Sequence, residues 1–592
     1  MKKISFFKRI SLVMLAIMLV TISCKDEFLE VLPTGSLSNA QVATKAGIEG
    51  ILIGAYAALN GEFGNRFEGP NHWITGTICG GEANKGTDPG DYSSINPVQR
   101  YETDPTQGDL NAFWQGRFEG ISRCNNVLRL LNEATDVSGG DAARIAGEAR
   151  LLRGHFYFDL HKHYGLANGS MGVPYIDETV EATEIAVQPQ LQGSAMWAKI
   201  DADFEFAAAN LPETLGDAGR VNKWAARAYL GKSKLYQGDY TAAKSIFDDV
   251  IANGVTTNGL KYALLDDYKQ IYNAENDNHA EAVMDVESAN NSGSTANANY
   301  FDDLNYPYNT GPDGPGNCCG FNQPSFELAN SFRTDANGLP LLDGSYNDAA
   351  NAVKHDYGVE ASDPFTPDEG NLDPRIDHSI GRRGIPYLDW IAHPGKAWIR
   401  NQPYAGPYSP KKYIYYKSQE NSFTDGSSWT RGYATMNYTI IRFADVILMA
   451  AEAEIELGNL DKGMEYINMV RSRAANSDTW VKNDDGSNAA NYVIGEYTSF
   501  ADKTEAMAAL RMERKLELSG EGHRFFDLVR WSNNDGFDIA GYLNTYLQNE
   551  AQYLVTMFGG ATFKSGKNES YPIPQTQIDI QGSDILKQNP GY

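Results

Sequence analysis

Several residue groups in the sequence have types that could do chemistry, but their spacing does not fit the motifs that such chemistry needs. Ser409 to Lys412 matches the S-x-x-K pattern of a nucleophilic serine, yet the companion motifs are absent, and we interpret the segment as a loop. His161 and His163 stand two residues apart on a predicted helix and therefore face different directions, unlike an i, i+4 metal pair. The sequence predicts no catalytic residue, no metal site and no cofactor, and calcium binding cannot be derived from it.

Two adjacent cysteines, Cys318 and Cys319, lie in a loop rich in glycine and proline. Their spacing suits neither a metal site nor a C-x-x-C redox pair. A disulfide between these neighbours would place a tight apolar ring on a turn, against which the face of a sugar could stack. The alternative is two unpaired thiols beneath the loop. Cys124, by contrast, lies in a helical pattern and is interpreted as a small core residue.

Candidate ligand-binding residues are aromatic, polar and charged side chains in three long loops. Long loops in compact proteins usually carry function, and flat uncharged ligands are held by aromatic faces together with a few oriented hydrogen bonds. We select Trp73, Cys79, Glu82, Asp91 and Tyr101 from residues 71–101, Tyr300, Tyr306, Tyr308, Cys318 and Cys319 from 300–321, and Arg383, Trp390, Arg400 and Tyr404 from 373–417.

The stretch 373–417 is the only distinctly basic one, with eight Lys or Arg residues against three Asp. A local charge of +5 inside an acidic chain predicts contact with an anionic ligand group or with a loop of a partner protein. The alternative for each residue is a solvated charge, or a ring packed beneath its own loop.

The elements that must position these loops are mostly helices. Apolar residues recur at helical spacing over 42–60, 111–133, 141–164, 194–210 and 502–530. Between the helices lie stretches rich in Gly, Asn, Asp, Ser and Pro at 61–110, 288–325, 334–437 and 476–500. The fold class is therefore predicted to be mainly α, with a face built of long loops.

Two predicted helical hairpins repeat the same pattern of small and large apolar residues, one over 228–250 and one over 448–470. Gly238 and Gly458 end the first helix of each hairpin. Because the copies are offset by 220 residues, we do not expect them to stack as consecutive repeat units.

The composition excludes several classes of protein. The chain has 592 residues, 42% of them hydrophobic and 21% charged, which is typical of a globular protein with a large core. Its formal net charge of −26 would repel the phosphates of nucleic acid, and no basic stripe offsets that repulsion. We therefore expect no nucleic-acid partner.

The first residues predict a secreted and lipid-anchored protein. Four positive charges before residue 10 precede an apolar run that ends at Val20, too short to span a membrane. Residues 1–23 are predicted to be a signal peptide. The following Cys24 resembles the lipidated first residue of a bacterial lipoprotein, and residues 25–27 resemble the signal that exports such proteins to the cell surface. Without residues 1–23 the net charge is −30, and the acyl chains hold the protein on a bilayer.

Residues 506–531 resemble the signature of the SusD/RagB family of nutrient-uptake lipoproteins. Further similarity follows in order along the chain, in 149–160, 172–175, 373–375, 442–453, 571–574 and 588–592. The charged signature residues are predicted to form a structural network that locks the helix in place, while the aromatic ones fill the core. The matching residues are Glu513, Arg514, Glu517, Leu518, Glu521, Gly522, Arg524, Phe525, Phe526, Asp527, Leu528, Arg530 and Trp531.

The resemblance implies a fold and a role. The fold is one SusD-like domain over 24–592, with an N-terminal part to about 270 and a C-terminal part from about 280, tetratricopeptide-like helical repeat pairs and a long-loop ligand-binding face. The implied role is a lid on a SusC-like TonB-dependent outer-membrane transporter, facing the cell exterior, that captures oligosaccharide without chemistry. Peptide is a less common ligand of the family.

Two other functions stay open on the residues alone. A lipid-anchored glycoside hydrolase needs only a pair of carboxylates, which 76 acidic residues could hide. An outer-membrane repeat scaffold needs only the helical hairpins. Turnover of an oligosaccharide would favour the hydrolase, and copurification with assembly machinery would favour the scaffold.

Overall fold

The computed structural model describes residues 42–592 apart from 62–63, 167–168, 317 and 427–430. The predicted signal peptide and Cys24 lie outside the described residues. The helices are α3 Lys45–Ala57, α4 Asn96–Gln99, α5 Gly108–Glu133, α6 Gly139–Tyr164, α7 Gly193–Asn210, α8 Lys223–Tyr236, α9 Tyr240–Asn253, α10 Phe326–Ser331, α11 Ile376–Ser379, α12 Gln402–Ala405, α13 Phe443–Glu456, α14 Leu460–Ala474, α15 Lys503–Glu517, α16 Arg524–Asp535, α17 Ile539–Ala551, α18 Val555–Phe558 and α19 Gln575–Gln581. The strands are β1 Ala83–Gly86, β2 Ala282–Val286, β3 Phe321–Pro324, β4 Ile380–Gly381, β5 Ser409–Pro410, β6 Thr424–Asp425, β7 Tyr433–Ala434 and β8 Tyr438–Arg442.

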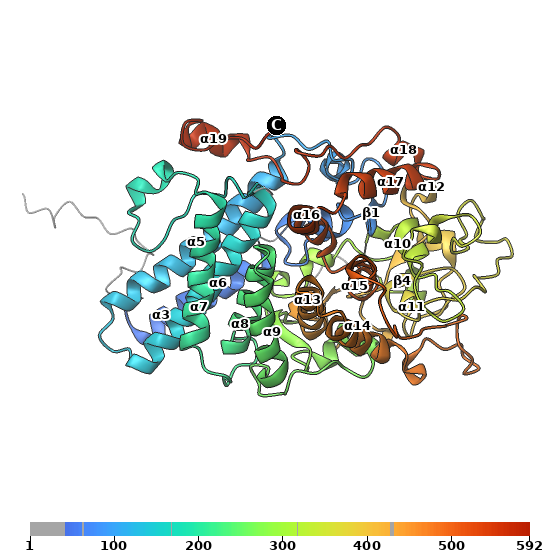
Figure 1. Cartoon of the computed structure of the whole chain (residues 1–592), viewed down its shortest axis with the longest axis horizontal. Coiled ribbons are helices and arrows are strands. Elements are labelled where there is room, and N and C mark those ends of the chain that lie inside the picture. The colour runs from blue at the N-terminus through green and yellow to red at the C-terminus, as the bar shows by residue number, and fades with distance from the viewer. Residues whose placement is uncertain (1–41, 62–63, 167–168, 317, 427–430) are drawn as a thin grey trace, which may run out of the picture.

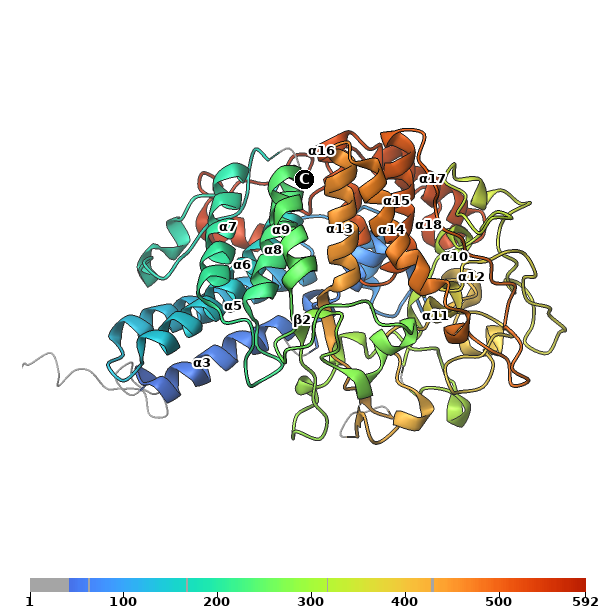
Figure 2. The same cartoon turned by 60° about the horizontal axis from the view of Figure 1, so that its bottom comes forward.

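The fold is mainly helical, as predicted, and its helices pack in sequence order. Helices α5 to α9 each contact the next one along the chain, and α13 to α15 form a second packed group. Figure 2 shows these helices in a row, with the loop-rich segments that follow α9 gathered to one side. The N-cap side chains of Ser138, Asn222 and Asp239 accept hydrogen bonds from the first turns of α6, α8 and α9, which fixes where these helices begin.

The two helical hairpins lie side by side, although we did not expect them to stack as consecutive repeat units. Helices α8 and α9 form the first hairpin and α13 and α14 the second, and α13 packs directly against α9. The 189 residues from 254 to 442 leave the helical layer and return to it through β8, which pairs antiparallel with β2. Separation in sequence therefore did not prevent stacking, because the intervening chain loops out of the repeat.

The helix predicted over 502–530 is two helices. Helix α15 ends at Glu517 and α16 begins at Arg524, with Gly520 and Gly522 both at positive φ in between. A Cβ atom on Gly522 would lie 2.1 Å from the carbonyl oxygen of Asn71, so only glycine allows this approach. The turn in the signature thus packs against the N-terminal part of the chain.

Short strands connect distant loops. All four sheets within the described residues have two antiparallel strands, and β1 pairs with β3 so that Gly86 lies opposite Phe321. This pairing joins the loops 61–110 and 288–325, which the sequence predicted to be irregular. The first of these loops also contains a π-helix, Trp73–Ile78, and α4.

One hydrophobic core extends from Ile48 on α3 to Leu586 near the C-terminus, and a small aromatic cluster lies apart from it. The core contains residues of both the N-terminal and the C-terminal part. No helix among the described residues is both long enough and apolar enough to pass through a membrane.

Candidate functional site

The charged residues of the signature form a buried ion-pair network, as predicted. Arg442 donates to Glu517 at 2.6 Å and to Glu521 at 2.8 Å, and all three side chains are almost fully buried. Burial alone would raise the pKa of Glu521, but the charges of Arg442 and Lys412 lower it to about 2. Further pairs join Arg375 to Asp373 and Glu513, Arg471 to Glu513, Arg473 to Glu281 and Glu517, Arg514 to Asp445 and Asp527, and Arg530 to Glu452 and Asp527.

This network supports the fold and takes no part in a surface site. Phe525, Phe526 and Trp531 are at most 3% exposed and pack in the core beside it. A buried charge that loses its partner is strongly destabilising, so the network fixes how α15, α16 and β8 meet. The signature therefore identifies the architecture and lies beneath the loops that carry ligand candidates.

The candidates from residues 71–101 lie mostly in the core, which corrects their selection as surface residues. Trp73 is fully buried, and its Nε1 donates to the carbonyl of Phe301 at 3.1 Å. The Tyr101 hydroxyl donates to the carbonyl of Cys79 at 2.7 Å, and both residues are buried. Glu82 is 2% exposed and accepts a hydrogen bond from the Gly520 amide at 3.0 Å. Burial raises the pKa of Glu82 to about 7.

Four further aromatic candidates are also buried. Tyr300 donates to the carbonyl of Asn60 and belongs to the main core. Tyr306 and Trp390 belong to the small aromatic cluster, in which Tyr415 accepts from the Trp390 Nε1 atom at 3.2 Å. Tyr404 is 5% exposed. These rings support the loops from below instead of presenting their faces to a ligand. Composition could not distinguish the two roles, because both use aromatic residues in glycine-rich loops.

The structure brings Asp91, Tyr308 and Arg400 together. Arg400 forms ion pairs with Asp91 and, at 2.8 Å, with Asp88, and the three charged side chains remain 28–34% exposed. The guanidinium lies 5.3 Å from the centre of the half-buried Tyr308 ring. Lys85 donates to the backbone carbonyls of Asp88 and Asp91 from below, and burial lowers its pKa to about 8. We name Asp88, Asp91, Tyr308 and Arg400 the arginine site.

Strained backbone holds the arginine site in place. Thr87, a β-branched residue, has φ of 54°, in the left-handed region where such residues are rarely found. Its amide donates to the carbonyl of Gly320 at 2.6 Å, and its hydroxyl accepts from Arg400 at 2.9 Å. Thr87 thereby links the arginine site to the cysteine loop through the β1–β3 pairing.

Cys318 and Cys319 are joined by a disulfide directly before Gly320, the residue that Thr87 contacts. Cys318 is half-buried, and Cys319 is 7% exposed, with its amide donating to the carbonyl of Leu304 at 2.9 Å. Tyr308 belongs to the same neighbourhood, because the amide of Gly320, the residue after Cys319, donates to the carbonyl of Tyr306 at 2.9 Å. The disulfide and Tyr308 therefore lie on segments that join the arginine site through Gly320 and Thr87.

A pocket of about 490 Å³ opens beside these residues, and we name it the loop pocket. Arg431 forms one wall, where it donates to the carbonyls of Gly311 and Gly314 and pairs with Glu420. Its guanidinium also lies 5.4 Å from the Trp390 ring, which ties the wall to the aromatic cluster below. The lining residues are Asn309, Thr310, Gly311, Pro312, Gly316 and Arg431.

The basic stretch does not form a basic surface, which corrects the expectation of an anionic contact there. Acidic residues of the stretch itself and of other segments pair with most of its charges, and the charge counted along the sequence omits the partners from other segments. Lys411 is buried and donates to two backbone carbonyls, and Arg383 donates to three. The ion pairs join Arg375 to Asp373, Arg382 to Asp377, Lys396 to Glu360, Arg400 to Asp88 and Asp91, and Lys412 to Glu521.

The structure also adds residues that the sequence did not single out. Asp88 and Arg431 belong to the arginine site and the loop pocket, and Thr87 links the first of these to the cysteine loop. Asp88 stands in an Asp-Pro-Gly-Asp turn, which is a local signal for a rigid loop. No sequence signal marks Arg431, since its partners come from segments 11 to 120 residues away.

No metal-binding arrangement is found among the described residues, and the serine and the last lysine of the S-x-x-K pattern have separate partners. No group of three or more His, Cys, Asp or Glu residues there is arranged to hold a metal ion. His161 packs against Trp197, whereas His163 pairs with the Thr75 hydroxyl at 3.0 Å, so the two point apart as predicted. Ser409 pairs with His393 in buried strand β5, and Lys412 instead contacts Glu521.

Comparison with known families assigns the chain to a class. The profile of the SusD family matches residues 280–592, and a second profile, described as starch-binding associating with outer membrane, matches residues 27–236. The chain belongs to the SusD family.

Relatives of full length support the same assignment. SusD-like protein P2 of Formosa agariphila is 24% identical over 591 residues, covering 99% of this chain and all of the relative. A solved structure titled laminarin binding SusD-like protein superposes with a TM-score of 0.64 at 24% identity, covering 92% of this chain and 99% of the other. Surface glycan-binding protein A from Bacteroides thetaiotaomicron, in complex with laminarihexaose, gives 0.60 at 20% identity, with 92% and 99% coverage.

Proposed function

We propose that this protein captures uncharged oligosaccharides at the outer surface of the outer membrane and passes them, unaltered, to a SusC-like TonB-dependent transporter. Lipid on Cys24 would hold it there. The observation that carries the binding role is the arginine site, where the half-buried Tyr308 ring lies against Arg400 next to the Cys318–Cys319 disulfide. Membership of the SusD family and the glycan-binding relatives support the same role.

The geometry of the arginine site suits the two kinds of surface that a sugar presents. The apolar ring face of Tyr308 and the disulfide match the C–H face of a pyranose. The carboxylates of Asp88 and Asp91 accept hydrogen bonds from hydroxyl groups, and Arg400 donates them. The half-exposed position of these groups lets a ligand bind and leave without burying an unpaired charge.

The charge balance favours uncharged ligands. Arg400 is already paired with two carboxylates and Arg431 with one, so neither offers a free positive charge to a uronate or a sulfate ester. Burial raises the pKa of Asp88, but the amides of Asp91 and Gly90 and the charge of Arg400 hold it below the ordinary range. Asp88 is thus ionised at neutral pH and repels an acidic sugar.

Isothermal titration against matched neutral and acidic oligosaccharides tests the binding role. We expect binding of at least one neutral series, such as β-glucan, α-glucan, xylan or mannan fragments, and at least tenfold weaker binding of uronate or sulfated fragments. Equal affinity for the acidic series would contradict the preference for uncharged ligands. Absence of binding throughout would contradict glycan capture.

The transport role needs a separate experiment. Affinity purification of the tagged protein from detergent-solubilised membranes of its native host should recover a TonB-dependent barrel, and Cys24→Ser should release the protein from the membrane fraction. Recovery of the protein without a barrel would contradict its role as the lid of a transporter. Chromatography of incubated oligosaccharide should show the intact chain, and shortened products would favour the hydrolase instead.

A further inference from the structure

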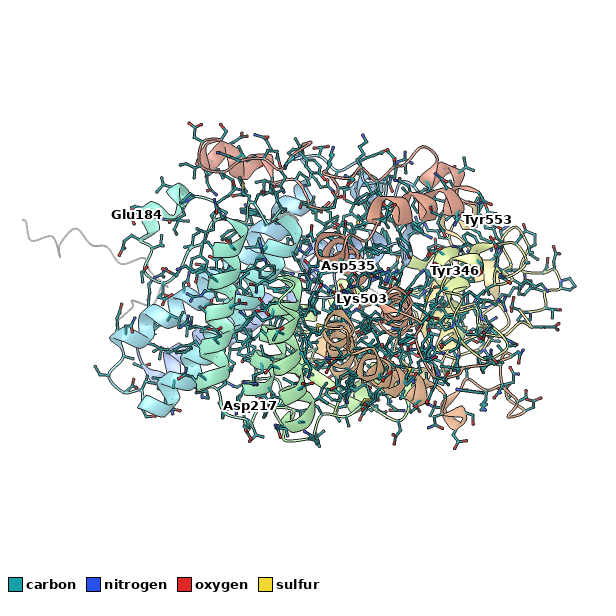
Figure 3. The ribbon with its side chains drawn as sticks, in the orientation of Figure 1. Glu184, Asp217, Tyr346, Lys503, Asp535 and Tyr553 are labelled. Atoms are coloured by element: carbon teal, nitrogen blue, oxygen red, sulfur yellow. A yellow bond between two sulfur atoms is a disulfide. The ribbon has the colours of Figure 1, made fainter. Side chains whose placement is uncertain are left out.

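A second group of aromatic side chains reaches the surface beside α12, and nothing in the arginine site accounts for it. We name Phe326, His355, Tyr357 and Tyr553 the aromatic platform. Tyr553 follows α17 and is 39% exposed, and His355 and Tyr357 are half-buried. Figure 1 shows α12, α17 and α18 close together, and Figure 3 labels Tyr553 in the same region.

The rings of the platform cover part of Tyr553, which stays 39% exposed. Phe326 stacks on the Tyr553 ring, with ring centres 4.4 Å apart and planes inclined by 27°. His355 and Tyr357 stand nearly perpendicular to Tyr553, at 5.1 Å and 5.6 Å. The Tyr357 hydroxyl donates to the backbone carbonyl of Tyr553 at 2.8 Å, which fixes the ring pair. Phe326 is 4% exposed and anchors the group in the core. The platform is therefore rigid before any ligand arrives.

The chemistry of the platform suits an uncharged ligand with an apolar face and polar edges. Burial lowers the pKa of His355 to about 4, so its imidazole is neutral at physiological pH. Within the described residues, the Tyr553 hydroxyl has no hydrogen-bond partner and can bond at the rim of the ring. A partly exposed aromatic ring with a hydroxyl at its edge suits stacking on a pyranose.

The platform is connected to the arginine site through α12. Gln402 of that helix accepts from the Gly358 amide at 2.9 Å and donates to the carbonyl of Asp356 at 3.2 Å, next to the platform rings. On the other side, Arg400 precedes α12, and the ring of Tyr404 lies 5.3 Å from Lys85, which holds Asp88 and Asp91. Both surfaces therefore belong to one rigid neighbourhood.

We propose that the aromatic platform is a second glycan subsite, which binds a further stretch of the same uncharged polysaccharide that occupies the arginine site. This inference rests on the proposed function. Two weak contacts on one chain raise the affinity for a long glycan, because the second contact forms at a high effective concentration. A short oligosaccharide occupies the arginine site alone and gains nothing from the platform.

Tyr553→Ala tests the subsite by comparing long and short ligands. The probes are laminarin, amylopectin, xylan and mannan in affinity gel electrophoresis, each with its own trisaccharide in isothermal titration. We expect Tyr553→Ala to weaken polysaccharide binding about five- to tenfold and to leave trisaccharide affinity unchanged, in line with the loss of one aromatic contact. Tyr553→Phe, which keeps the ring, should bind polysaccharide within twofold of the wild type.

Controls separate the outcomes. Val555→Ala changes an apolar side chain that is 65% exposed two residues further on, and it should alter neither affinity. Equal polysaccharide binding by Tyr553→Ala and the wild type would overturn the subsite while leaving glycan capture intact. Loss of barrel copurification with unchanged polysaccharide binding would also overturn it and make the platform a protein contact. No wild-type binding to any probe would overturn the proposed function itself.

Discussion

Arg400 forms an ion pair with Asp91, a residue 309 positions earlier in the chain. The pair joins a loop after β1 to the segment before α12, and Tyr308 from a third loop packs on the guanidinium. Each loop is held by its own short elements, among them the β1–β3 pairing. The candidate site is thus assembled from both parts of the chain, and no continuous segment contains it.

Tyr308→Ala should lower glycan affinity with little effect on stability. The half-buried ring supplies one stacking surface, whose loss costs about 1 kcal/mol and therefore about fivefold in the dissociation constant. Isothermal titration with the best neutral oligosaccharide measures this change. Tyr240→Ala, at an equally half-buried tyrosine on α9, is the matched control and should bind like the wild type. Equal affinity of the two variants would remove Tyr308 from the site.

Replacing both Cys318 and Cys319 by serine should weaken binding without unfolding the protein. The pair spans adjacent residues, so its removal frees almost no chain entropy, and the apolar ring is the main loss. Titration of the double variant, and of the wild type after reduction, should give similarly reduced affinities. Thermal melting should differ by only a few degrees. Full affinity in both the serine variant and the reduced wild type would show that the disulfide ring does not contact the ligand.

Trp73→Ala should destabilise the fold instead of acting on the ligand. Deleting a fully buried indole costs about 3–5 kcal/mol in the free energy of unfolding, since it leaves a cavity and an unpaired Phe301 carbonyl. Chemical denaturation measures the loss. Trp480→Ala, at a half-buried tryptophan, should cost less. If Trp73→Ala kept wild-type stability but bound the ligand more weakly, Trp73 would be a ligand-binding residue after all.

Glu82→Gln should flatten the dependence of stability on pH. Burial raises the pKa of Glu82 from 4.5 to about 7, against the opposing charges of Arg524, Lys515 and Lys412. The folded state therefore holds this proton more tightly than the unfolded state, and the resulting stabilisation is present below pH 4.5 and lost as the pH rises to 7.

Denaturation of wild type and variant at pH 4 and pH 8 measures the effect of Glu82. The free energy of unfolding of the wild type relative to Glu82→Gln should fall by about 3 kcal/mol from pH 4 to pH 8. Each unit of pKa shift corresponds to about 1.4 kcal/mol. Glu133→Gln, at an exposed glutamate on α5, should follow the wild type. A difference between Glu82→Gln and wild type that does not vary with pH would contradict the assignment.

The sequence predicted the helices well and the surface poorly. Helical periodicity placed α3 and α5 to α7 within a few residues of their observed ends, because each helix buries one continuous apolar face. Periodicity missed the end of the helix before Gly522. The carbonyl of Asn71, far away in the sequence, packs against Gly522 and leaves no room for a side chain there. Trp73 and Tyr308 looked alike in composition, yet one is in the core and the other is half-exposed. Their different burial depends on how loops from distant parts of the chain pack together, which composition does not show.

The packing of α13 against α9 bears on how such a molecule can move. The interface is reinforced by the ion pairs of Lys232 with Asp445 and of Lys244 with Glu454, which link the same two hairpins. A hinge between the N-terminal and C-terminal parts would have to break these contacts and expose apolar surface. A movement of this protein against a partner would therefore carry the two hairpins together as one rigid body.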